Sequence, residues 1–281
     1  MKTSAFRFLL RPSPALAALA TLICCCLQAA GASLPPVYLT IVSHNEEPLN
    51  GRPDYTANRD YYLQNRSLVK RFAETITSRG ATLNFESDWN YLQAVDKIDA
   101  GNVLTNTAGK NIVRWMKEDL GVEVDPHAHE SQYNYADVAY LIDQLGVTPS
   151  KNVGGFLYDP PDNSQGWEQH EAGINGWNYP SYFWRADHLW GAGTYLHLGN
   201  DDRSSGIWRP DDRYNFYVDN PDQRLLYIGG GPGGQPGVMQ LLNDIETGRA
   251  PSNGFYTANL MMIQDQMTPQ SIAQLGSFID S

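Results

Sequence analysis

Two histidines, His127 and His129, are separated by a single residue and follow the segment 122–125, which is predicted to be a buried strand. Imidazoles two positions apart at the end of a strand can converge on one cation, and the flanking carboxylates of Asp125 and Glu130 can act as further ligands or orient the rings. This pattern indicates a divalent metal site. An exposed loop that happens to hold two histidines and two acids is the alternative interpretation of the same residues.

Further ligand-type residues follow two other predicted strands. His44, Glu46 and Glu47 come directly after the β-branched segment 37–42, and Asp88 comes shortly after the segment 81–85. The carboxyl ends of parallel strands in an α/β sheet lie at one edge, where sites are usually found. We therefore expect these groups to face the histidine pair.

The elements that must position these residues alternate regularly between strand and helix. Apolar, β-branched runs predict seven strands, whereas stripes of apolar residues at helical spacing predict the helices between them. This alternation predicts an α/β fold, namely a distorted seven-stranded (β/α) barrel. The predicted strands are residues 37–42, 81–85, 122–125, 152–157, 190–197, 225–228 and 259–263, and the predicted helices are residues 60–79, 112–120, 135–145 and 238–245.

The first 32 residues read as a signal peptide rather than as part of the fold. Lys2, Arg7 and Arg11 form a basic start, an apolar run follows at residues 15–27, and small residues precede a cleavage site near Ala32. Residues 33–281 are then expected to form one barrel domain. The predicted location of the mature protein is secreted or periplasmic.

All three cysteines, at positions 24–26, lie within this leader. The mature chain is therefore expected to lack disulfides, and a zinc site would have to use histidine and carboxylate ligands, which suits an open catalytic site. A lipid anchor on a leader cysteine is the alternative to cleavage.

The formal net charge is −11, and loss of the three basic leader residues would make it −14. A strongly acidic chain is a poor partner for nucleic acid or for an anionic membrane surface. No second apolar run approaches the length needed to span a bilayer.

Residues 159–217 are rich in Trp, Tyr, Gly, Asn and Pro and show little periodicity. Exposed aromatic rings beside polar side chains are suited to stacking on sugar rings. Alternatively, these aromatic residues pack an insertion against the barrel. The glycine-rich loop at residues 229–234 lacks the Lys-Ser/Thr pair of a phosphate-binding loop, which favours a role in shaping a substrate site.

The layout resembles the NodB-homology polysaccharide deacetylases, also called carbohydrate esterase family 4, within the glycoside hydrolase and deacetylase barrels. The stretch from Ser43 to Pro48 is similar to the family's Thr-Phe-Asp-Asp-Gly-Pro, which puts Glu46 at the metal-ligand position and Asn45 where the family has its base. His127-Ala128-His129 matches the family's His-Ser/Thr-X-X-His with shorter spacing. Trp208-Arg209-Pro210 is similar to the Arg-X-Pro motif, and Met262 to Asp265 stand in place of the Leu-X-His motif.

The resemblance implies a divergent, metal-dependent hydrolase that acts on carbohydrate, with deacetylase-like chemistry. A divalent ion, expected to be zinc, would be held by His44, Glu46, His127 and His129. Glu47 or Asp88 would handle the proton, and Trp89 and Arg209 would contact substrate.

Two other functions remain open from the residues. A metal-independent glycoside hydrolase on the same barrel would use two carboxylates, and Asp88, Glu130 and Asp265 are available. A non-catalytic carbohydrate-binding protein is favoured somewhat by Asn45 at the position of the family's base. An amidohydrolase-like interpretation fits less well because the histidine pair follows two complete β/α units.

Overall fold

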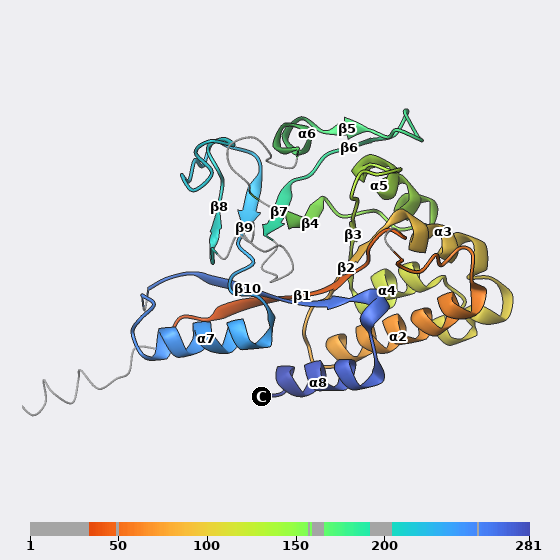
Figure 1. The fold of residues 1–281 in the computed structure, drawn as a ribbon, viewed down its shortest axis with the longest axis horizontal. Coiled ribbons are helices and arrows are strands. Elements are labelled where there is room, and N and C mark those ends of the chain that lie inside the picture. Colours follow the sequence, from red (N-terminus) through yellow and green to blue (C-terminus); the bar gives the residue numbers. More distant parts are fainter. Residues whose placement is uncertain (1–33, 49–50, 157, 159–165, 192–203, 252) are drawn as a thin grey trace, which may run out of the picture. The chain divides into compact units, whose positions relative to one another are not determined.

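The computed structural model describes residues 34–281 except 49–50, 157, 159–165, 192–203 and 252 (Figure 1). The predicted signal peptide and its cysteines lie outside the described residues, as does most of the predicted strand 190–197. Pro35–Ser281 is one compact unit by itself. Within its described part, no helix combines the length and apolar character needed to cross a membrane.

The described elements alternate between strands and helices. The strands are β1 (Val37–His44), β2 (Asn84–Ser87), β3 (Glu123–Pro126), β4 (Asn152–Phe156), β5 (Ile174–Asn175), β6 (Phe183–Trp184), β7 (His188–Gly191), β8 (Ile207–Trp208), β9 (Leu226–Ile228) and β10 (Tyr256–Ile263). The helices are α2 (Arg59–Thr77), α3 (Trp89–Ile98), η1 (Gly101–Thr107), α4 (Ile112–Leu120), α5 (Tyr135–Gln144), α6 (Trp167–Ala172), α7 (Gly234–Glu246), η2 (Gln264–Gln266) and α8 (Pro269–Ile279).

The strands form two four-stranded sheets and one short hairpin. The first sheet has the order β10-β1-β2-β3 and is parallel throughout. The second has the order β4-β7-β9-β8, in which only β8 runs antiparallel, and β5 pairs with β6 in the hairpin. The fold is therefore mixed α/β with parallel sheets.

Backbone hydrogen bonds join both edge strands of the first sheet to residues that flank strands of the second sheet. At the edge strand β3, the carbonyl of Val124 accepts from the backbone N–H of Ser150, which precedes β4, at 2.9 Å. At the other edge strand, β10, the backbone N–H of Asn259 donates to the carbonyl of Gly230, which follows β9, at 3.0 Å. Neither sheet edge is free along its whole length.

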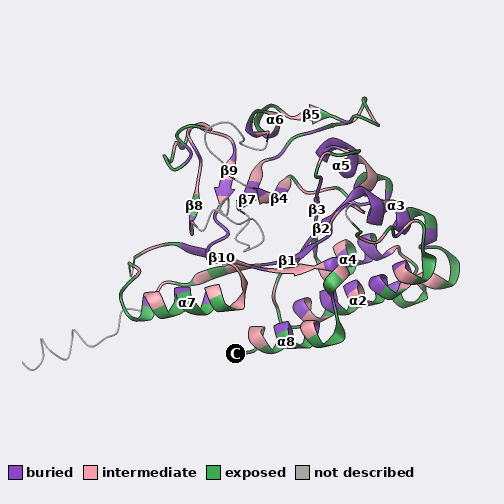
Figure 2. Ribbon diagram, in the orientation of Figure 1, coloured by how far each residue is buried: buried purple, intermediate pink, exposed green. Residues whose placement is uncertain are grey.

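Helices cover the first sheet with their apolar sides. α2 packs against both α4 and α8, and the three lie along the same side of β1 in Figure 1. Figure 2 shows buried residues along β1, β2 and β3 and on the inward faces of these helices. Val69, Phe72 and Ile76 of α2 are almost fully buried, because apolar residues three or four apart share one helix face.

Three of the differences between the structure and the predicted elements lie in or beside the first sheet. β2 begins at Asn84 and continues through polar residues, because Asn84 finds a buried partner in Asp125. The helix α3 begins directly afterwards, and its N-cap Asp88 accepts a hydrogen bond from the backbone of Tyr91. The helix α8 follows the last strand and starts with a capping box at Thr268.

Candidate metal centre

Four side chains meet at the carboxyl ends of β1 and β3. His44, Glu46, His127 and His129 each offer one ligand atom, and these atoms all lie within 4.8 Å of one another, so the group could hold a metal ion. β1 and β3 flank β2 in a parallel sheet, so their ends lie at the same edge. The structure thus brings together the four residues that the sequence proposes as ligands.

Glu46 is the hub of this cluster. One oxygen lies 2.7 Å from Nε2 of His129, and the other lies 3.2 Å from Nε2 of His44 and 3.4 Å from Nη2 of Arg52. Burial opposes the charge on Glu46, but the hydrogen bonds from His129 and His44 outweigh it and hold the carboxyl pKa well below its usual range. The carboxylate is therefore ionised, as a metal ligand must be.

His127 is the most buried of the three histidines in the cluster. Its side chain is buried, and neither ring nitrogen has a hydrogen-bond partner among the described residues. Its ring centroid lies 4.2 Å from that of His44 and 5.0 Å from that of His129. Burial, together with the positive charges of these neighbours, holds the pKa of His127 well below its ordinary value, which leaves a neutral ring with an available lone pair.

Glu86 supports the cluster from β2, a role that sequence reasoning did not assign. Nδ1 of His44 donates to Oε2 of Glu86 at 2.7 Å, and the two residues are direct neighbours in the parallel register. A Cβ added at Gly154 would overlap the Glu86 carboxylate, so β4 carries glycine where this side chain needs room. A carboxylate on the second nitrogen of a ligating histidine fixes its tautomer and orientation.

The same contacts set the charge of His44. Burial lowers its pKa, but the hydrogen bonds to Glu46 and Glu86 outweigh burial and raise the pKa of His44 to about 9. In the protein without an ion, this ring is therefore protonated at neutral pH. Metal binding through its Nε2 would displace that proton.

Asp125 lies in register with Glu86 but does not join the four ligands. One of its oxygens accepts from Nδ2 of Asn84 at 2.7 Å and the other from Nδ2 of Asn152 at 3.1 Å. Burial raises the pKa of Asp125 to about 7, and the nearby charge of Glu86 contributes. The residue supports the base of the site and is not directly available to an ion.

Two buried carboxyl groups, the predicted catalytic residues Asp88 and Glu47, lie close enough to influence each other. Oδ1 of Asp88 accepts from the backbone of Tyr91 at 3.0 Å and from Nδ2 of Asn45, whereas Oδ2 has no partner among the described residues. Burial, with a contribution from the charge of Glu47, raises the pKa of Asp88 to about 8. Oε2 of Glu47 accepts from the hydroxyl of Ser131, and Oε1 has no described partner.

The two residues predicted to contact substrate, Trp89 and Arg209, lie in different parts of the fold. Trp89 is 9% exposed and stacks on Tyr133 with ring centroids 4.8 Å apart, so this face of the indole is covered. Its Nε1 is buried without a described partner. Arg209 follows β8 in the second sheet, where its backbone N–H donates to Asp219 at 2.9 Å, and no described contact joins its side chain to the four-residue cluster.

The remaining acids proposed for a glycosidase lie outside the cluster. Glu130 follows His129 with a left-handed backbone (φ 55°), and its carboxylate accepts from Nε2 of Gln169. Asp265 lies in η2 beyond β10, and its Oδ1 is buried without a described partner. His197, at the end of the predicted strand 190–197, lies outside the described residues.

No protein-family model matches the chain, and no curated protein is similar to it in sequence. Among solved structures, the 4-alpha-glucanotransferase from Thermococcus litoralis is similar, with a TM-score of 0.46 and 10% sequence identity. The similarity covers 87% of this chain and 37% of the glucanotransferase chain, so this chain spans little more than a third of that enzyme's length. A likeness at this TM-score carries no argument about activity.

Proposed function

We propose that the protein is a metal-dependent hydrolase that acts on carbohydrate, with deacetylase-like chemistry. The observation that carries the proposal is His127, a buried imidazole with both nitrogens unpartnered, within reach of His44, Glu46 and His129. Buried polar groups are nearly always satisfied, so an unpaired ring beside three other ligand-type side chains indicates a site for an ion. The family resemblance supplies the type of reaction.

The proposed framework is a distorted seven-stranded barrel with the order β1-β2-β3-β4-β7-β9-β10. Two observations support closure: the hydrogen bond from Ser150 to Val124 beside β3, and the hydrogen bond from Asn259 to Gly230 beside β10. In such a barrel, the cluster would lie at the mouth formed by the carboxyl ends of the strands.

Zinc is the proposed ion, because three imidazoles and one carboxylate are a donor set that suits it. His44 would bind through Nε2, since its Nδ1 is occupied by Glu86. A bound zinc ion supplies a Lewis acid that polarises a carbonyl group and lowers the pKa of water. The side chain of His129 is 47% exposed, which leaves one side of the cluster open to a substrate.

The two nearby carboxyl groups divide the proton chemistry between them. With a pKa of about 8, Asp88 is mostly protonated at neutral pH and can donate a proton to a leaving group. Glu47 then accepts the proton of the attacking water through its unpartnered Oε1. This division would compensate for Asn45 at the position where the resembling family has its base.

The proposed substrate is an acetylated carbohydrate outside the cytoplasm. Its class rests on the family resemblance, and the exposed rings of Trp177 and Tyr214 within residues 159–217 supply surfaces suited to sugar stacking. Export rests on the predicted leader. The acidic charge argues against nucleic acid as a partner.

The test is acetate release from a panel of acetylated oligosaccharides by the mature chain, with zinc and after chelation. We expect hydrolysis that requires zinc and is lost in His127→Ala. A zinc-saturated protein that releases no acetate from any member of the panel would contradict the deacetylase assignment.

A metal-independent glycoside hydrolase is the second candidate, favoured by one observation. A buried carboxyl with a raised pKa beside another carboxylate, as found for Asp88 and Glu47, is the arrangement that glycosidases use for acid catalysis. Release of reducing sugar by the chelated protein, lost in Asp88→Asn, would establish this candidate instead.

A further inference from the structure

Arg52 lies in the loop between β1 and α2 and contacts the four-residue cluster of His44, Glu46, His127 and His129 through Glu46. Its Nη2 lies 3.4 Å from Oε1 of Glu46, the same oxygen that His44 contacts. Its Nη1 is buried and has no hydrogen-bond partner in the part of the chain that the structure describes. The side chain as a whole is 34% exposed, so it lies at the border between the cluster and solvent.

A guanidinium beside metal ligands is unexpected if the site serves only to hold a cation. Its charge acts on the cluster, since it is among the causes that lower the pKa of His127. A divalent ion, three neutral imidazoles and the carboxylates of Glu46 and Glu86 leave no net charge, so the guanidinium of Arg52 makes the group positive. Such a site favours a ligand that brings a negative charge of its own.

The unpaired Nη1 of Arg52 indicates which chemical group carries the negative charge of the ligand. A buried guanidinium N–H without an acceptor is costly, and its rigid fork matches the oxygens of a carboxylate. Glu46 occupies one branch of the fork and leaves Nη1 for another acceptor.

We propose that Arg52 is the anion-recognition residue of this site and binds a ligand carboxylate beside the metal cluster. The inference rests on the proposed function. The carboxylate has two chemical sources: the acetate released by deacetylation, or an acidic group on the sugar itself, as in a uronate.

The test measures binding to zinc-loaded protein without any hydrolysis. Acetate, glucuronate and uncharged glucose are titrated calorimetrically into the wild type, Arg52→Gln, Arg52→Lys and the matched control Arg71→Gln. Arg71 is an exposed arginine on α2. Zinc affinity of each variant is measured separately, and circular dichroism checks that each variant is folded.

We expect carboxylate affinity to fall about tenfold or more in Arg52→Gln, because hydrogen bonds to charged groups are worth that much. Arg52→Lys should fall between wild type and Arg52→Gln, and Arg71→Gln should match wild type. A loss seen with acetate identifies the product carboxylate, and a loss confined to glucuronate identifies a substrate carboxylate. Zinc affinity should be unchanged or tighter in Arg52→Gln, since a nearby positive charge is removed.

Two results would overturn the inference while leaving the proposed function intact. One is equal affinity of Arg52→Gln and wild type for both carboxylates. The other is weaker zinc binding in Arg52→Gln, which would make Arg52 a support for Glu46. Failure of the wild type to bind zinc would overturn the proposed function and this inference together.

Discussion

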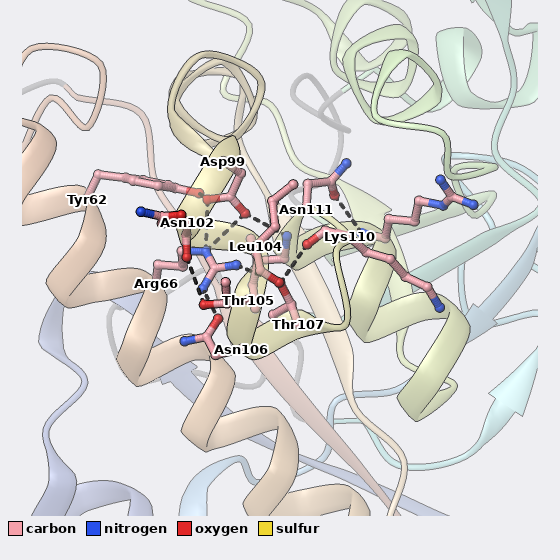
Figure 3. A network of polar contacts seen from close by, with 12 residues as sticks. Tyr62, Arg66, Asp99, Asn102, Leu104, Thr105, Asn106, Thr107, Lys110 and Asn111 are labelled. Atoms are coloured by element: carbon pink, nitrogen blue, oxygen red, sulfur yellow. Dashed lines mark hydrogen bonds and ion pairs between the residues drawn. The ribbon is translucent and has the colours of Figure 1, made fainter.

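Two buried clusters of charged side chains in the described part of the chain differ in how completely they are paired. In the first, centred on Arg66 and Asp99, every group at the centre has partners (Figure 3). Nε of Arg66 donates to both oxygens of Asp99 at 2.8 and 3.0 Å. Its other two nitrogens donate to Asn106 at 2.9 Å and Thr107 at 3.0 Å.

Asp99 is equally well satisfied. It accepts from the hydroxyl of Tyr62 at 2.7 Å and from the backbone N–H of Ile112 at 2.7 Å. The cluster therefore ties α2 to η1 and to the start of α4. It leaves no donor or acceptor at its centre for a ligand, which is the arrangement of a structural network.

The second cluster, formed by His44, Glu46, His127 and His129, has the opposite character. Unpartnered buried atoms occur on His127 and Arg52 and on the neighbouring carboxyl groups of Asp88 and Glu47. Both clusters are buried and charged, so burial alone does not distinguish a structural network from a functional site. The difference in pairing does, because unsatisfied groups are retained where a ligand completes them.

Among the groups with unpaired buried atoms, Glu47 is expected to have the largest effect on the rate of hydrolysis when replaced. Replacing Glu47 by Gln removes the proton acceptor without changing shape, so hydrolysis should slow by about 10²–10⁴-fold while zinc content is unchanged. Initial rates and metal analysis of the same preparation check this. Glu171→Gln, at an exposed position, is the matched control, and an E47Q rate equal to that of this control would remove Glu47 from the mechanism.

The satisfied cluster should respond in stability instead. Arg66→Ala leaves the carboxylate of Asp99 buried without its ion pair, which should lower the free energy of unfolding by about 3–5 kcal/mol. Denaturant titration of zinc-free protein measures this, with Arg71→Ala on the same helix as control. A loss below about 1 kcal/mol would show that the paired network is not a structural one.

Glu86 links the two kinds of pairing, since it is a paired carboxylate that contacts His44 in the cluster where His127 and Arg52 have unpaired atoms. Glu86→Gln weakens the support of His44, so zinc affinity should fall about 10–100-fold. Competition with a chelator of known affinity measures the change, and the exposed Glu123→Gln is the control. Equal zinc affinities in the two variants would argue against a role for Glu86 in positioning His44.

The last prediction concerns pH and Asp88. Its pKa rises from 3.8 to about 8 on folding, so the folded state binds the proton more tightly. This contribution to stability is fully present below about pH 4 and is lost as the pH rises towards 8, by about 1.4 kcal/mol for each pH unit.

Asp88→Asn should flatten this dependence, whereas Asp96→Asn, at an exposed position on the same helix, should not. Unfolding free energies of zinc-free protein between pH 5 and pH 8 give the comparison. Identical slopes for wild type and D88N would mean that Asp88 is ionised in the folded protein.

Most of the first sheet and the four candidate metal ligands could be predicted from the sequence. His44, Glu46, His127 and His129 come together because parallel strands end at one edge, and strand patterns are visible in the residues before each pair. Asp88 also carried a signal for α3, since an aspartate before an amphipathic segment predicts a helix N-cap.

The supporting residues could not be predicted. Glu86 meets His44 only through the register of β1 and β2, and Arg52 reaches Glu46 through an irregular loop. Trp89 lies in the first turn of α3 and stacks on Tyr133, and its contact with substrate stays a prediction. Barrel closure depends on contacts between distant segments and stays a prediction.

The central claim is that the unpaired His127 marks a metal site, and zinc stoichiometry tests it most directly. The purified mature chain is loaded with zinc, dialysed and analysed beside His127→Ala and the matched control His188→Asn, whose ring contacts Asn152 outside the cluster. We predict about one zinc per chain for the wild type and the control and far less for His127→Ala. No zinc in the wild type, or an unchanged content in His127→Ala, would contradict the account.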